Sequence, residues 1–163
     1  MKALDTIKHT LQASPHVIEK YLEDLSDAEI LERPVPLANH IAFQLGHLVL
    51  AERLALEELA VKDLPELPKD FSKNHQKDNH LSDNPEEFSS KDIYLALLKV
   101  HRQASIKYLE NLTEKDLDRE GPLSMRSYAP TLGLALNMNG IHSLMHVGQI
   151  SVLRRKLEKP IAI

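Results

Sequence analysis

The chain has 163 residues, of which 42% are apolar and 27% charged, the balance of an ordinary water-soluble domain with a real core. Its net charge of −4 argues against nucleic acid as a main partner, because phosphate binding requires a basic face. The absence of cysteine excludes disulfides, thiolate metal ligands and a cysteine nucleophile, and it agrees with a reducing cytoplasm. We therefore expect one cytoplasmic domain covering residues 1–163.

Apolar residues recur every three or four positions, which is the period of an α-helix. The N-terminal segment lacks the continuous apolar run of a secretory signal, and instead carries a helical stripe from Leu4 to Leu25, with a bend expected at Pro15. Ser26–Glu29 is a capping-box pattern that predicts a short turn of helix. Two prolines then interrupt the chain, and a second helix is predicted from about Leu37 to Ala60.

The stretch from Asp63 to Ser89 is polar and too long for a plain connection, so we expect a functional lid or a short helix near Asp70–Lys77. A third helix is predicted from Ser90 to Leu112, and a loop over Gly121–Pro130. A last helix, capped by Thr131, is predicted to run to about Glu158. Four long helices joined by crossovers predict an all-α four-helix bundle.

The second and fourth predicted helices are apolar around most of their circumference, so one bundle cannot cover all of their apolar faces. A subunit interface would cover the rest, and we expect a homodimer. No apolar run is long enough to span a membrane. The densest basic run, Arg154–Lys156, is interpreted as a helix C-terminus stabilised by the helix dipole.

Three histidines interrupt these apolar helical segments: His47 in the second helix, and His142 and His146 in the fourth. His142 and His146 are four residues apart, so they share a helical face and can hold one ion. His47 from a facing helix would complete three protein ligands and leave a coordination position open, as in catalytic zinc sites. A lone histidine is more often a hydrogen-bonded core residue, but three unpaired buried imidazoles would be costly without a shared ion.

Other metal architectures lack their motifs. No histidine has a glutamate three residues before it, which excludes the di-iron E-x-x-H pattern, and the zinc-protease motif H-E-x-x-H is also absent. The histidine faces offer no obvious aspartate for a site of two histidines and one carboxylate. A neutral three-histidine site for zinc, nickel or iron(II) remains, with a metal-free histidine-lined core as the alternative.

Four further residues are candidates for lining the open side of this site: His40, Glu52, Asn139 and Gln149. Asn139 and Gln149 share a helical face with His146, and either can orient an imidazole or donate to a bound water. Glu52 can act as a base, although a salt bridge at the rim is the commoner role.

The other histidines are expected outside the site. His75 and His80 fall in the polar stretch, where we expect them to be solvated. Tyr94 and His101 share a face of the third helix and are expected on the helix surface or a pocket wall.

The segments Asn39–Leu48 (NHIAFQLGHL) and His142–Ile150 (HSLMHVGQI), the latter followed by Leu153–Leu157 (LRRKL), carry a family resemblance. Their order and spacing resemble the DinB-like superfamily, specifically the DinB_2 branch of metal-binding four-helix proteins, over about residues 22–160. The resemblance implies an up-down-down-up bundle, a triad of His47, His142 and His146, a divalent metal (zinc or nickel in many relatives), and frequent homodimers.

Characterised relatives include thiol transferases that use bacillithiol or mycothiol and a thiol-dependent maleylpyruvate isomerase. The resemblance therefore implies a low-molecular-weight thiol as a second cofactor. The leading hypothesis is a metal-dependent thiol transferase or hydrolase acting on a small molecule, in which the ion lowers the pKa of a bound thiol or water. The alternative is a non-catalytic dimeric bundle that binds a small ligand or holds a structural metal.

Overall fold

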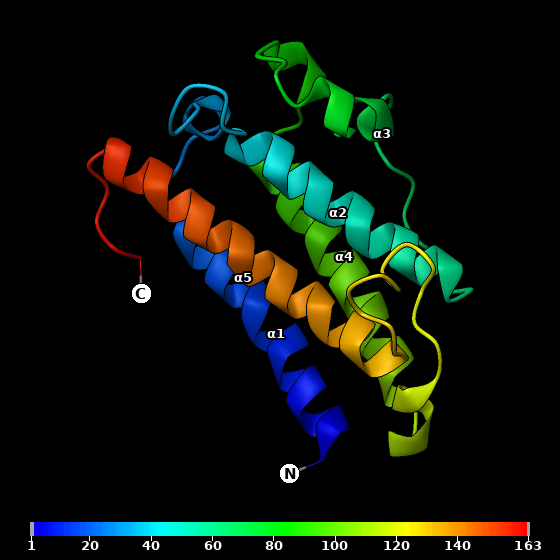
Figure 1. Ribbon diagram of the computed structural model, residues 1–163. Coiled ribbons are helices and arrows are strands. Elements are labelled where there is room, and N and C mark those ends of the chain that lie inside the picture. Colours follow the sequence, from blue (N-terminus) through cyan, green and yellow to red (C-terminus); the bar gives the residue numbers. More distant parts are fainter. Residues whose placement is uncertain (1, 163) are drawn as a thin grey trace.

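The computed structural model describes residues 2–162, and within that range it consists of helices, loops and one isolated β-bridge between Glu120 and Thr131. The four long helices are α1 (Ala3–Leu22), α2 (Ile41–Glu58), α4 (Lys91–Glu110) and α5 (Leu132–Lys156). Figure 1 shows that α1 and α5 run in one direction and α2 and α4 in the other. The prediction of an all-α four-helix bundle with long crossovers is confirmed, and the long crossover joins the parallel helices α2 and α4.

The crossovers carry short helical segments: α3 (Phe71–Asn74), η1 (Glu29–Leu31), η2 (Lys77–Asn79), η3 (Pro85–Glu87) and η4 (Glu114–Asp118). The short helix expected near residues 70–77 is α3, which contacts α2 (Figure 1). The capping box before η1 is also present, because the Glu29 carboxylate accepts from the Ser26 amide at 2.7 Å. None of the helices within residues 2–162 is both long and apolar enough to cross a membrane.

Helix α1 continues through Pro15, so the proline does not end the helix. Proline has no amide hydrogen, so the carbonyl of Leu11, one turn earlier, loses its helical donor. The guanidinium of Arg102, from α4, supplies a replacement and donates to that carbonyl at 3.2 Å. A side chain from a neighbouring helix therefore replaces the hydrogen bond that Pro15 cannot make.

The core contains two large apolar clusters, one at each end of the bundle, and a small third cluster that includes Ala55 and Met125. The first includes Ile18, Leu45 and Ile150, and the second includes Leu11 and Leu136. Along all four long helices, buried polar residues lie between the two clusters: Ser14, Glu52, Arg102, Ser105, Asn139 and Ser143. This polar layer crosses the bundle at the level of the histidine segments.

Three residues that we expected at the surface or in a pocket wall are instead buried: His75, Tyr94 and His101. The Tyr94 hydroxyl accepts from the Ser89 amide at 3.1 Å and donates to Nε2 of His75 at 2.8 Å. The ring of His75 lies against the backbone of α2 at Gly46, where an added Cβ would stand only 1.9 Å from it. The polar crossover is thus anchored in the core by one histidine, while His80 remains partly exposed.

Candidate metal centre

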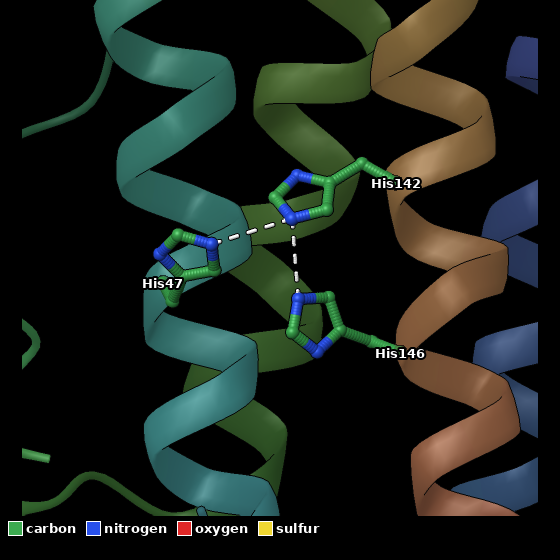
Figure 2. A group of neighbouring side chains, drawn as sticks. All are labelled: His47, His142 and His146. Carbon is green, nitrogen blue, oxygen red and sulfur yellow. Dashed lines mark hydrogen bonds between the residues drawn. The ribbon is translucent and has the colours of Figure 1, made fainter.

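Three predicted residues from two helices come together on one side of the bundle. His47 is on α2, and His142 and His146 lie one turn apart on α5, with all three rings pointing toward one another (Figure 2). Nε2 of His142 is 3.3 Å from Nε2 of His47 and 3.2 Å from Nε2 of His146. The ligand nitrogens of all three lie within 4.8 Å of one another.

The two separations from His142 match the ligand spacing of a tetrahedral metal site. Two nitrogens that are each about 2.0–2.1 Å from a tetrahedral ion stand about 3.3–3.4 Å apart. Both separations from His142 are therefore close to the spacing of two ligands on one ion. The donor set, three neutral imidazoles, suits zinc, nickel or iron(II).

Gln44, which the sequence analysis did not single out, fixes the orientation of His146. The Gln44 amide nitrogen donates to the Asn39 carbonyl at 2.8 Å, so its oxygen Oε1 faces Nδ1 of His146 at 2.9 Å. An amide oxygen can only accept, so Nδ1 must carry the proton and donate it. The lone pair of His146 is then on Nε2, which faces the other two rings, and such partners commonly orient metal-binding histidines.

Replacing Gln44 with methionine is expected to lower zinc affinity by about 10–100-fold, because the tautomer and orientation of His146 are no longer held. Competition with a coloured chelator measures the affinity. Gln103→Met on the exposed face of α4 is the matched control and should leave the affinity unchanged. Equal affinities in the two variants would rule out this role for Gln44.

The electrostatics of the site favour neutral rings. His146 is buried, whereas His47 and His142 keep some exposure to solvent. Burial lowers the pKa of His142 and of His146 to about 4, and it also lowers the pKa of His47. A positive charge on one ring would further disfavour charge on its neighbours. All three rings are therefore neutral at pH 7, with lone pairs free for a cation.

A cavity of about 270 Å³ adjoins the triad and is lined by His47 and His142. Its walls come from α2 (Leu50, Ala51 and Leu54), from the loop before α5 (Ser124, Met125 and Tyr128) and from Asn139. A larger depression of about 440 Å³ lies between α1 and α4, and none of the three histidines lines it. The smaller cavity is therefore the one that can bring a ligand to the triad.

Of the four residues expected around the site, Asn139 lines the cavity, and His40, Glu52 and Gln149 do not. His40 caps α2: its Nδ1 accepts from the Phe43 amide at 3.0 Å, and its Nε2 donates to the Ser82 carbonyl at 3.2 Å. Gln149 lies on the exposed surface of α5, and its side chain is close enough to His146 to raise the pKa of that ring.

Glu52 pairs with Arg102 in the core rather than at the rim, and each side chain is only 4% exposed. Arg102 donates to both Glu52 carboxylate oxygens, at 2.9 and 3.1 Å. The guanidinium also donates to Ser14 on α1 and to the Asn139 carbonyl and Ser143 hydroxyl on α5. One side chain thus links all four long helices just behind the triad, and holds α2 and α5 in register.

The sequence and the fold were compared with those of known proteins. Residues 10–150 match the model of a family described as the DinB superfamily. A solved structure described as a conserved protein from Enterococcus faecalis superposes with a TM-score of 0.69 at 20% identity. The superposition covers 98% of this chain and 99% of the other, so the two share a fold. No curated protein matches the sequence significantly.

Proposed function

The chain belongs to the DinB superfamily, and we propose that it is a metal-dependent enzyme of the thiol-transferase or hydrolase kind. The observation that carries this proposal is the convergence of the ligand nitrogens of His47, His142 and His146 beside a cavity. A divalent ion, zinc or nickel first and iron second, would act there as a Lewis acid that lowers the pKa of a thiol or water. The net charge of −4 disfavours nucleic acid and anionic membrane surfaces as partners, which leaves a small-molecule substrate, and the absence of cysteine supports a cytoplasmic location.

The protein's own residues supply the rest of the site. The three imidazoles hold the cation, and Gln44 keeps the lone pair of His146 directed at it. The triad contains no carboxylate or thiolate, so the full charge of the cation is available to polarise a ligand. The cavity leads to His47 and His142, the two partly exposed members, which supports substrate entry from that side.

The test is metal analysis of the untagged protein, followed by thiol titration of the cobalt-substituted form. We expect about one ion per chain and a sulfur-to-cobalt charge-transfer band when a low-molecular-weight thiol is added. A bound ion without any change on thiol addition would favour a hydrolase or a structural metal. The lack of any stoichiometric metal would overturn the proposal and leave a histidine-lined core.

We also propose that the protein is a homodimer, with α5 in the interface. Large apolar side chains remain exposed along α5, namely Leu134, Ile141, Leu144, Met145 and Val152. Met145, at 59% exposed, is among the most exposed of them, and the neighbouring Gly148 has open space above it for a second helix. A second copy of the chain would cover these apolar side chains and remove them from water, as subunit interfaces in symmetric oligomers do.

We expect light scattering to give about twice the mass of the 18.5 kDa chain, and Met145→Glu to shift the mass toward the monomer. The change places a charge in an apolar interface. Val100→Glu, at a comparably exposed site on α4, is the control that should remain dimeric. A wild-type protein of 18.5 kDa at high micromolar concentration would contradict the proposal.

A further inference from the structure

The depression of about 440 Å³ between α1 and α4 is separate from the triad, and its walls come from two helices that contact each other. Pro15 on α1 and Ile106 on α4 give it an apolar floor, and longer polar side chains border it. Its volume falls within the range of about 300–1,000 Å³ that ligand sites commonly have. It can therefore hold a small organic molecule.

Arg102 explains why no side chain of α4 fills this space. Its guanidinium turns inward, where it bonds to Glu52 on α2 and to the Asn139 carbonyl on α5. The side chain is only 3% exposed, so it borders the depression from below and does not extend across it. Because Arg102 also donates to the Leu11 carbonyl on α1, it is held by three other helices, and the depression is already formed without a ligand.

Two of the charged residues that border the depression are already neutralised. The Glu110 carboxylate is 2.7 Å from the Lys8 ammonium. The Arg102 guanidinium is paired with the Glu52 carboxylate at 2.9 Å. Neither residue contributes a free charge to the depression.

The other charged residues of the lining leave one positive charge in excess. They are Glu19, Lys99 and Lys107, and none of them forms an ion pair within residues 2–162. Glu19 and Lys99 also line a smaller space beside Pro15, so they are neighbours and their charges offset each other. Lys107 is therefore left as the cation without a counterion, in a protein whose net charge is −4.

Two side-chain amides also border the depression. Gln103 lies one turn before Lys107 on α4 and shares its face, and Gln12 borders the depression from α1. An ammonium group together with amide N–H donors is suited to a carboxylate. The carboxylates of Glu19 and Glu110 disfavour a dianion such as a phosphate monoester, because like charges repel.

We propose that the depression between α1 and α4 is a second ligand site, which binds a small monocarboxylate with an apolar body. The carboxylate would lie at Lys107 and accept from the Gln103 amide, and the apolar body would lie against Pro15 and Ile106. This inference goes beyond the proposed function and does not depend on a metal ion, because no residue of the triad lines the depression.

2-Naphthoate and 2-naphthamide are matched probes, because they share a shape and differ in charge. Binding to the protein as purified is followed by NMR through the side-chain amide signals of Gln12 and Gln103, which line this depression and not the cavity beside the triad. We expect 2-naphthoate to bind with a Kd on the order of 1 mM. It should bind about fivefold more tightly than 2-naphthamide, the effect of one partly exposed ion pair, and at least as tightly as 2-naphthyl phosphate.

Variants separate this site from the triad. Lys107→Gln should remove the preference for 2-naphthoate, because it takes away the unpaired ammonium. Lys73→Gln, at an exposed position on α3, is the matched control and should keep the preference. His146→Ala should also keep it, whereas 2-naphthoate bound by an ion at the triad would be lost in that variant and retained in Lys107→Gln.

Three results would overturn the inference: the same preference in Lys107→Gln as in the wild type, tighter binding of 2-naphthyl phosphate than of 2-naphthoate, or no movement of the Gln12 and Gln103 signals. A preference for 2-naphthoate in a protein that holds no metal would support this inference and overturn the proposed enzyme, so the two can fail separately.

Discussion

Replacing His146 with alanine is expected to abolish stoichiometric metal binding at neutral pH. The loss of metal affinity should exceed the roughly 10–100-fold loss expected when a residue that only orients a ligand, such as Gln44, is replaced. The variant removes one of the three proposed metal ligands and leaves Gln44 without its partner. Metal per chain, measured by elemental analysis after dialysis against a weak chelator, reports the loss. The fold should persist, because the surrounding core is mostly Leu, Ile and Val, and circular dichroism checks this.

His9→Ala is the matched control, since His9 is an exposed histidine on a long helix, far along the chain from the triad. It should bind metal as the wild type does. If wild type, His9→Ala and His146→Ala all hold the same amount of metal, the triad is not the binding site.

The same measurement against pH gives a second signature. A proton and the ion compete for one imidazole lone pair. Burial holds the pKa of His142 and His146 near 4, so we expect occupancy to persist below the usual histidine range and to fall as the pH approaches about 4. A steep loss near pH 6.5, the ordinary value for free histidine, would mean that the ligands are exposed histidines elsewhere.

The free energy of unfolding is also expected to fall as the pH is lowered. The unfolded chain takes up protons on these histidines below about pH 6.5, and the folded chain does not until about pH 4. The stability contributed by the neutral rings is therefore fully present above pH 6.5 and is lost as the pH falls toward 4. A metal ion bound at the triad would add to this stabilisation in the same pH range.

The helices and the triad could be predicted because their signals are local. The H-x-x-x-H spacing places His142 and His146 on one face, and His47 interrupts the apolar face of a second long helix. Gln44 also had a local signal, since it lies one turn before His47. Its partner is on α5, however, and no pattern within one helix reveals which residue faces it.

The burial of charged and polar residues could not be predicted in the same way. A glutamate on a helix is usually solvated, so Glu52 was expected at the rim, and its burial depends on Arg102, fifty residues away. His75 lies in a polar segment whose composition indicates exposure, and it is buried because that crossover folds back onto Gly46 of α2. Both cases are set by long-range contacts that leave no periodic pattern in the sequence.

The buried pair of Arg102 and Glu52 leads to the largest expected change in stability. Arg102→Met should lower the free energy of unfolding by about 3–5 kcal/mol, because Glu52 is left as an uncompensated charge in the core. The Leu11 carbonyl opposite Pro15 also loses its donor, and the α5 contacts at Asn139 and Ser143 are lost. Urea unfolding followed by circular dichroism measures the change.

Two comparisons show whether the effect comes from the buried charge. Arg53→Met breaks the more exposed pair with Glu57 one turn along α2, and should cost less than about 1 kcal/mol. The double variant Arg102→Met with Glu52→Met should recover much of the lost stability, because buried ion pairs are often replaceable by apolar side chains of similar size. Recovery would be incomplete, since the Leu11 carbonyl still lacks a donor and Ser105 loses its acceptor on Glu52. A single Arg102→Met variant as mild as Arg53→Met would mean that water or a rearranged side chain compensates Glu52, and that the polar layer behind the triad does not hold α2 and α5 in register.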